Sequence, residues 1–344
     1  MTSLQALSQG FEDVVGQSSA IQLLAQAIAR DRIAPAYLFA GSTGIGKCLV
    51  AQRFAERLLA RLKIELGTTP EGDRSLPTPQ QSTQRLSVLR QRIEQRNHPD
   101  LFWVEPTYLH QGKRVSISEA EELGVKRRSP PQIRLEQIRE ITRFLSRPSL
   151  ESERAVVVLE DAETMAEPAA NALLKTLEEP GKATLILLAP GVDSLLPTLV
   201  SRCQRIPFAP LTPEEMQQVL ERNEKSEIVG QSEVMAIAQG SPGLAIASWK
   251  RLQTIDPELL SAAQRPLTSL RISLELARRI SKVLDPEDQI WLIQYLQHYY
   301  WNQSYRPKII QQLETARQHL GNYVQPRLVW ETTLMQIHRD QTYG

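Results

Sequence analysis

The sequence predicts a parallel α/β domain followed by a helical half, and three observations support this prediction. Short apolar runs that suit strands buried on both faces alternate with segments of helical periodicity up to about residue 210. A glycine-rich turn joins one of these strands to the helix after it, which is typical of α/β domains. After Pro210 the strand pattern ends, and helices separated by Gly and Pro breaks follow.

Four segments of the first half are predicted as strands because each is short and apolar: residues 36–40, 101–104, 155–159 and 184–189. Helices are predicted from apolar spacing at residues 21–28, 49–62, 85–96, 133–145 and 169–179. Strands buried on both faces that alternate with helices indicate a parallel sheet with helices on both faces.

Two polar stretches interrupt this alternation. Residues 67–84 are rich in Pro, Thr, Ser, Gly and Gln and predict a surface loop. Residues 113–131 predict a second exposed connection, which contains Lys126-Arg127-Arg128. A solvated loop is favoured over a DNA contact for this charged run.

The helical half begins with a clear start signal, since Thr212, Pro213 and Glu215 form an N-cap, a first helical proline and a capping box. Further on, large apolar side chains recur at helical spacing: Trp291, Leu292, Tyr295, Leu296 and Tyr299. Such a stripe is favoured as core over an interface, although aromatic residues are also common at interface centres.

Composition limits the possible functions. The 344 residues suggest two or three domains, and 41% hydrophobic content is enough for a packed core. The formal net charge is only +1, so any contact with DNA must be local or shared with partners. Two cysteines and five scattered histidines predict no zinc and no other structural metal. Without an apolar run of roughly 20 residues or a signal-like segment at 1–10, we expect a cytoplasmic protein with no membrane contact.

A candidate phosphate-binding loop follows the first predicted strand, and it consists of Gly41, Ser42, Thr43, Gly44, Ile45, Gly46, Lys47 and Cys48. Its glycines let backbone N–H groups surround phosphate oxygens, and Lys47 would reach the β and γ phosphates. An ordinary glycine turn is the alternative. The motif predicts weak binding of ATP or ADP, with Mg²⁺ only alongside the nucleotide. Cys48 replaces the hydroxyl that normally binds this hard ion, so metal-assisted hydrolysis is not expected.

Glu160 and Asp161 end the strongest predicted strand. In nucleotide-hydrolysing enzymes an acid at this strand end faces Mg²⁺, and its neighbour orients the attacking water. The usual order is Asp-Glu, so this pair is a degraded version of the motif. Taken alone, acids at a strand end are more often solvated loop residues.

Two further segments complete a pattern: residues 171–180, Asn-Ala-Leu-Leu-Lys-Thr-Leu-Glu-Glu-Pro, and Ser201-Arg202-Cys203. With it, the chain resembles the clamp-loader branch of the AAA+ ATPases, and within it the delta-prime subunits of bacterial DNA polymerase III. The similarity runs from Phe11 to Pro210 and is weaker beyond. It implies an AAA+ P-loop domain over 1–210 with an insertion at about 61–97. A helical lid over 211–252 and an all-helical collar over 253–344 would follow.

The resemblance also implies roles for residues. Arg202 would be an arginine finger that enters the nucleotide site of a neighbouring subunit, whereas in isolation it would be taken as a surface arginine in a salt bridge. Pro190-Gly191 and Gly243 stand where a motor subunit has side chains that sense phosphate. Glu160 and Asp161 would be a degenerate Walker B motif, so the chain's own ATPase activity is expected to be absent or very weak.

The function implied is support for ATP-driven loading of the sliding clamp onto primed DNA during replication. Partners would be delta and gamma/tau subunits in a hetero-oligomeric ring, and polymerase activity would belong to the holoenzyme. The insertion before His98-Pro99-Asp100 lacks the four cysteines of its relatives. Two alternative functions are considered. Glu160, Pro190 and Gly243 argue against a gamma/tau-type motor, and the near-neutral charge argues against a stand-alone DNA-binding protein.

Overall fold

The computed structural model describes residues 10–60, 79–123, 130–179, 181–304, 306–322 and 324–343. The first part of the predicted insertion, 61–78, lies outside these residues, as does Lys126-Arg127-Arg128. The chain forms two compact units, of which the first ends at Glu215 and the second continues from Met216. No helix among the described residues is long and apolar enough to cross a lipid bilayer.

A five-stranded parallel sheet in the order β2-β5-β6-β1-β7 forms the centre of the first unit. Its strands are β1 (Ala36–Ala40), β2 (Leu101–Val104), β5 (Ala155–Leu159), β6 (Ala183–Ala189) and β7 (Gln204–Pro207). The four predicted strands are confirmed. The edge strand β7 was not predicted because three of its four residues are exposed and only Ile206 is buried.

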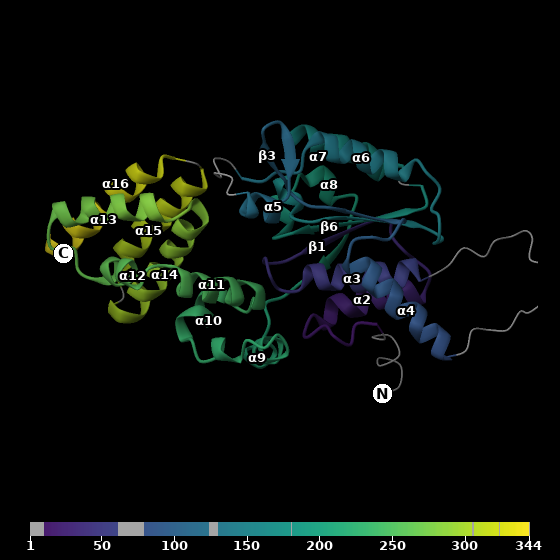
Figure 1. Cartoon of the computed structure of the whole chain (residues 1–344), viewed down its shortest axis with the longest axis horizontal. Coiled ribbons are helices and arrows are strands. Elements are labelled where there is room, and N and C mark those ends of the chain that lie inside the picture. The colour runs from purple at the N-terminus through teal and green to yellow at the C-terminus, as the bar shows by residue number, and fades with distance from the viewer. Residues whose placement is uncertain are drawn as a thin grey trace, which may run out of the picture. The chain divides into compact units, whose positions relative to one another are not determined.

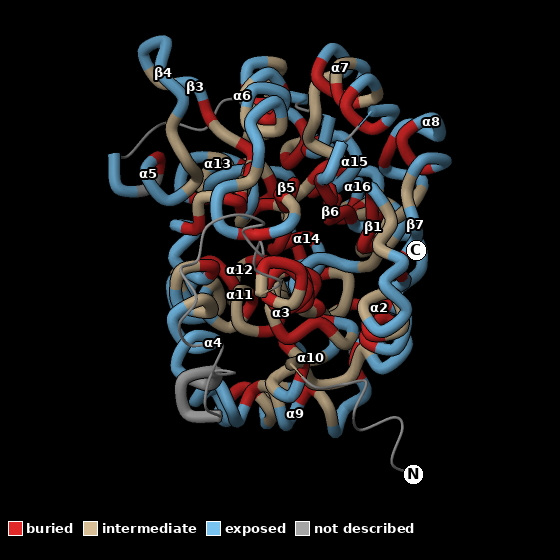
Figure 2. Tube along the Cα trace, turned by 90° about the vertical axis from the view of Figure 1, so that its right-hand side faces the viewer, coloured by how far each residue is buried: buried red, intermediate tan, exposed pale blue. Residues whose placement is uncertain are grey.

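Helices cover both faces of this sheet, as predicted. They are α2 (Ser18–Ala29), α3 (Lys47–Leu59), α4 (Pro79–Glu94), α6 (Leu135–Leu145), α7 (Glu167–Glu178) and the short α8 (Pro197–Val200). Figure 1 shows α6 and α7 over one face and α2 and α3 over the other. Every residue of β5 and β6 is buried, and Figure 2 shows these strands inside the layers of helices. Burial on both faces explains their unbroken apolar sequences.

Most of the first half of the predicted exposed connection, 113–131, is exposed, but the prediction that it lacks regular structure is wrong. The chain forms a hairpin of β3 (Tyr108–His110) and β4 (Lys113–Val115), followed by α5 (Ile117–Glu122). Gln111 and Gly112 both have positive φ, which suits the two-residue turn of a hairpin. Ser116 and Glu119 form a reciprocal capping box, with backbone-to-side-chain distances of 3.1 and 2.7 Å. The hairpin turn and the capping box were not predicted because the interpretation of this stretch was based on its polar composition.

The described part of the chain beyond β7 is helical, as predicted. Its α-helices are α9 (Pro213–Arg222), α10 (Ser232–Ala238), α11 (Pro242–Thr254), α12 (Pro257–Gln264), α13 (Leu270–Val283), α14 (Pro286–Ser304), α15 (Pro307–Gly321) and α16 (Pro326–Tyr343). The predicted capping box of α9 is present, since Thr212 N donates to Glu215 Oε2 at 2.9 Å and Glu215 N donates to Thr212 Oγ1 at 3.3 Å. Most of these helices start with proline, which tolerates the first helical position.

One apolar core holds α12 to α16 together. The predicted stripe on α14 contributes to it: Trp291, Leu292 and Leu296 are buried, and Tyr295 and Tyr299 pack against the core from its edge. The stripe is therefore core, as favoured from the sequence.

Candidate functional site

The loop between β1 and α3 has the backbone of a phosphate-binding turn. Gly44 and Gly46 adopt φ of 77° and 100°, which glycine tolerates best. At Gly41 a Cβ atom would lie 2.6 Å from the carbonyl oxygen of Phe208, so a larger residue does not fit. The helix α3 begins directly after this turn at Lys47, and its first N–H groups therefore border the loop.

Gln17 braces this loop from the segment before α2. Its Nε2 donates to the carbonyl oxygens of Ile45 at 3.3 Å and Ala209 at 2.7 Å, and its Oε1 accepts from Ala209 N at 3.1 Å. One side chain thus connects the loop to the chain that leaves β7. Gln17 was not predicted as a site residue, although it belongs to the segment 11–17 on which the resemblance begins.

Lys47 is buried within the loop, with 7% of its surface exposed. Its Nζ donates to the carbonyl oxygens of Gly41 at 2.5 Å and Ser42 at 2.8 Å. Burial lowers the pKa of Lys47, while the charges of Asp161 and Glu163 act in the opposite direction. The ammonium group therefore occupies the loop and lies in the field of acids from the end of β5.

Glu160, directly after β5, is held by three side chains. Cys48 Sγ donates to its Oε1 at 3.1 Å, whereas Trp103 Nε1 and Arg96 Nη2 donate to its Oε2 at 2.9 and 3.3 Å. Burial raises the pKa of the Cys48 thiol, and the negative charge of Glu160 raises it further. The thiol is therefore a neutral donor to Glu160 at physiological pH.

Arg96 reaches Glu160 from the turn after α4. Its φ is 55°, a left-handed conformation that ends the helix and turns the chain towards β2. The guanidinium carbon lies 5.1 Å from the centroid of the Trp103 ring, and Nη1 donates to Glu105 Oε2 at 2.5 Å. Stacking on an aromatic ring and pairing with two carboxylates fix this cation beside Glu160.

Asp161 and Glu163 complete the acidic end of β5. Asp161 has a φ of 47°, and burial raises its pKa, as does the charge of Glu160. Burial also raises the pKa of Glu163, whose Oε2 is buried without a hydrogen-bond partner in the described structure. These two acids, rather than Glu160, are the carboxylates of this strand end that other side chains do not saturate.

At Cys48 and Glu160, the arrangement does not fit the Mg²⁺ of nucleotide-hydrolysing proteins. That ion needs nearly octahedral oxygen ligands, whereas Cys48 offers a protonated sulfur and Glu160 has accepted three donors. In the described ranges, no group of three or more His, Cys, Asp or Glu side chains is placed to hold a metal ion.

The His98-Pro99-Asp100 motif has a structural role. Asp100 is 2% exposed, and its carboxylate accepts backbone N–H groups from Leu150 at 2.5 Å, Glu151 at 2.8 Å and Ser152 at 2.7 Å. His98 Nδ1 accepts from Asp100 N at 3.1 Å. The motif therefore fixes the loop that leads into β5, and thus the strand that presents Glu160.

Arg202 lies apart from the phosphate loop, between α8 and β7. Its Nη2 bonds to Glu178 Oε1 at 2.8 Å and its Nη1 to the carbonyl oxygen of Thr198 at 3.0 Å. The side chain is 38% exposed. The structure thus brings the phosphate loop and the acids at the end of β5 together, and it places Arg202 elsewhere on the same unit.

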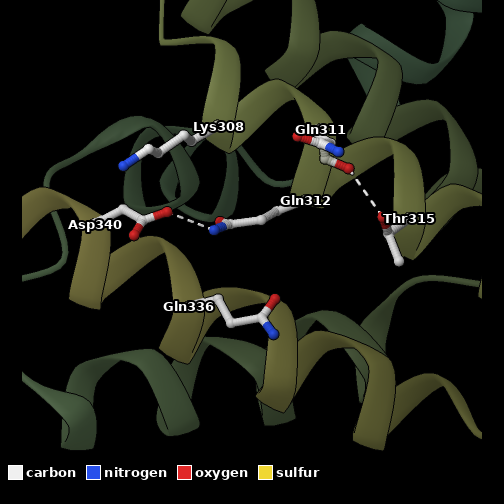
Figure 3. Close-up of a pocket in the computed structure, with 6 residues that line it drawn as sticks. All are labelled: Lys308, Gln311, Gln312, Thr315, Gln336 and Asp340. Carbon is white, nitrogen blue, oxygen red and sulfur yellow. Dashed lines mark hydrogen bonds between the residues drawn. The ribbon is translucent and has the colours of Figure 1, made fainter. Parts of the chain in front are cut away.

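Two hollows lie elsewhere. One of about 310 Å³ lies between α15 and α16, and Figure 3 shows its six polar lining residues: Lys308, Gln311, Gln312, Thr315, Gln336 and Asp340. Another of about 300 Å³ lies beside α3 and α4 and includes Glu56, Arg57 and Arg90. Neither is lined by a residue of the phosphate loop.

Two family models match consecutive parts of the chain. A model described as DNA polymerase III, delta subunit, matches residues 16–212, which is more than half of the chain. The model of the cyanobacterial DNA polymerase III delta prime C-terminal domain matches residues 214–337. The chain belongs to the DNA polymerase III delta-prime family.

Individual subunits of DNA polymerase III are similar to this chain over part of their length. The DNA polymerase III subunit delta' of Bacillus subtilis is 34% identical over 203 residues, covering 58% of this chain and 50% of that protein. The subunit delta' of Pseudomonas aeruginosa is 33% identical over 218 residues, which cover 62% of this chain and 55% of that protein. The chain thus spans about half the length of these curated relatives. The Escherichia coli subunit tau is 29% identical over 215 residues, which cover 62% of this chain and 27% of that protein.

A solved structure supports the fold. The DNA polymerase III gamma subunit-related protein of Thermotoga maritima superposes with a TM-score of 0.51 at 17% identity, covering 94% of this chain and 99% of that one. The predicted fold, a parallel sheet with helices on both faces followed by a helical half, is confirmed.

In this delta-prime family member, the sequence located the loop and the acids of β5 but not their contacts. Arg96, Trp103 and Glu105 were not predicted, because none belongs to a motif and their positions near Glu160 depend on strand pairing. Glu178, in contrast, lies within the quoted 171–180 motif, and its position there was an available signal for the contact with Arg202.

Proposed function

We propose that this chain is a non-motor, delta-prime-type subunit of a bacterial clamp loader in the cytoplasm. With delta and gamma/tau subunits in a hetero-oligomeric ring, it would support ATP-driven loading of the sliding clamp onto primed DNA. Its three parts would be the AAA+ domain 1–210, a lid at 211–252 and a collar at 253–344. The family matches over 16–212 and 214–337 support this role.

The observation that carries the proposal is the state of Glu160. Its carboxylate accepts from Cys48, Trp103 and Arg96, and these donors take most of the acceptor positions that the metal-facing acid of a motor offers to the ion. Pro190 follows β6 without a side chain that can bond to phosphate. ATP or ADP would therefore bind weakly in the glycine loop, and hydrolysis would remain near background.

Arg202 would act on a neighbouring subunit. A guanidinium group has five N–H donors and a delocalised positive charge, which suit the charge that develops during phosphoryl transfer. Its ion pair with Glu178 is solvent-exposed on both sides, at 38% and 54%, and exposed pairs contribute only about 0–1 kcal/mol. Arg202 can therefore leave Glu178 for a phosphate at small cost.

Reconstitution tests this function. The chain is mixed with delta and gamma/tau subunits, and gel filtration, ATP turnover and clamp loading on primed DNA are measured with and without it. We expect a stable complex whose clamp loading depends on this chain, while the isolated chain turns over ATP near background.

Failure to enter the complex would contradict the proposed role. Robust ATP turnover by the isolated chain would favour the gamma/tau-type motor instead.

A further inference from the structure

The contacts of Glu160 bear on what the phosphate loop binds. A Mg²⁺ ion at a phosphate loop normally screens the phosphates from the acid at the strand end. Here a protein cation is already in place, because Arg96 Nη2 lies 3.3 Å from Glu160 Oε2. The negative charge of Glu160 is therefore paired within the chain.

Arg96 is fixed more firmly than an ordinary surface arginine. It stacks on Trp103 at 5.1 Å, and Trp103 Nε1 itself donates to Glu160 at 2.9 Å. Glu105 binds the other end of the guanidinium. The three groups brace one another around Glu160, and Cys48 occupies its remaining oxygen at 3.1 Å. These donors take three of the roughly four acceptor positions of the carboxylate, so an ion at Glu160 would have to compete with them.

We propose that the loop Gly41–Lys47 binds the phosphates of a nucleoside di- or triphosphate without a divalent cation, and that Arg96 neutralises Glu160 in place of the ion. The proposal deepens the nucleotide-binding part of the proposed function and rests on that part alone. It also gives a role to the end of the cysteine-free insertion 61–97, since Arg96 lies there.

The test is calorimetric titration of the full chain with ADP, once with excess Mg²⁺ and once with EDTA. For the wild type, we expect the two dissociation constants to agree within about tenfold, the equivalent of about 1.4 kcal/mol. Arg96→Ala exposes Glu160 as an unpaired charge near the phosphates. Its affinity in EDTA should fall by about tenfold or more, and Mg²⁺ should recover part of the loss.

Three further variants make the result specific. Arg96→Lys keeps the charge and should retain most of the affinity in EDTA. Arg92→Ala removes an arginine from the last turn of α4 that pairs with Glu151 instead, and it should leave both constants unchanged. Lys47→Ala should abolish binding, which places the ADP in the loop. Circular dichroism establishes that each variant is folded.

A gain of more than about tenfold in wild-type affinity on adding Mg²⁺ would overturn the proposal. Unchanged binding in EDTA by folded Arg96→Ala would overturn it as well. A complete lack of ADP binding would refute both this proposal and nucleotide binding by the loop. The clamp-loading assay would be untouched, since it does not depend on the nucleotide affinity of the isolated chain.

Discussion

Cys48 and Cys203 are thiols that the fold keeps protonated. Burial raises the pKa of Cys203 to about 11, and that of Cys48 is raised as well. Because the thiolate is the reactive form, alkylation of Cys203 by iodoacetamide at pH 8 should be about a hundredfold slower in the folded chain than in urea, and alkylation of Cys48 should be slowed as well. Mass spectrometry of the two labelled peptides measures both rates.

The pH dependence of Cys203 has a defined sign. Its folded pKa is raised, so its contribution to stability is complete below the ordinary thiol pKa and is lost as pH rises through about 11. Labelling of Cys203 should accelerate over the same interval. Equal labelling rates in folded and unfolded chain at pH 8 would show that the thiols are not buried as described.

At the scale of one residue, sequence predicts chemistry better than it predicts contacts. Gly41, Gly46 and Lys47 lie where the motif places them, because backbone conformation and the helix start are local properties. The pairing of Arg96 with Glu160 bridges 64 positions along the chain. No local pattern encodes such a contact, which depends on β2 lying beside β5.

Among the elements, the loop before β5 depends on a single side chain, that of Asp100. Asp100→Ala would leave the N–H groups of Leu150, Glu151 and Ser152 without their buried acceptor. Since bonds to a charged acceptor contribute about 1.5–3 kcal/mol each, we expect a loss of about 3 kcal/mol or more in the free energy of unfolding. Urea denaturation followed by circular dichroism measures it.

The control for this change is Asp193→Ala, which removes an exposed carboxylate and should leave the urea midpoint almost unchanged. A folded Asp100→Ala protein with the wild-type midpoint would mean that the motif does not hold the loop.

Elements differ in how far their sequences reveal them. The strands β5 and β6 were predictable because burial on both faces demands unbroken apolar residues. The edge strand β7 was not, since exposed Gln204 and Arg205 resemble a loop and only pairing with β1 makes them a strand. Hairpin β3-β4 was missed because its polar composition suggested an exposed connection.

For the whole molecule, the order of the elements was accessible from the sequence. The change from strands to helices near residue 210 was predicted, and the two compact units divide close by, between Glu215 and Met216. The separation of the helical half into lid and collar stays a prediction. Periodicity finds helices, but their assignment to domains depends on which apolar faces pack together.

The central claim is that this chain completes another subunit's ATP site with Arg202. The direct measurement is DNA-dependent ATP turnover and clamp loading by a reconstituted complex carrying Arg202→Ala, with assembly verified by gel filtration. Arg205→Ala is the matched control, because it removes another exposed arginine three positions along the chain.

We predict that the Arg202→Ala complex assembles but loads clamps poorly, while Arg205→Ala behaves as wild type. An arginine finger supplied in trans is worth about 10³–10⁵ in rate at its own site, although total turnover falls less when other sites still work. Unchanged clamp loading and turnover by an assembled Arg202→Ala complex would contradict the account.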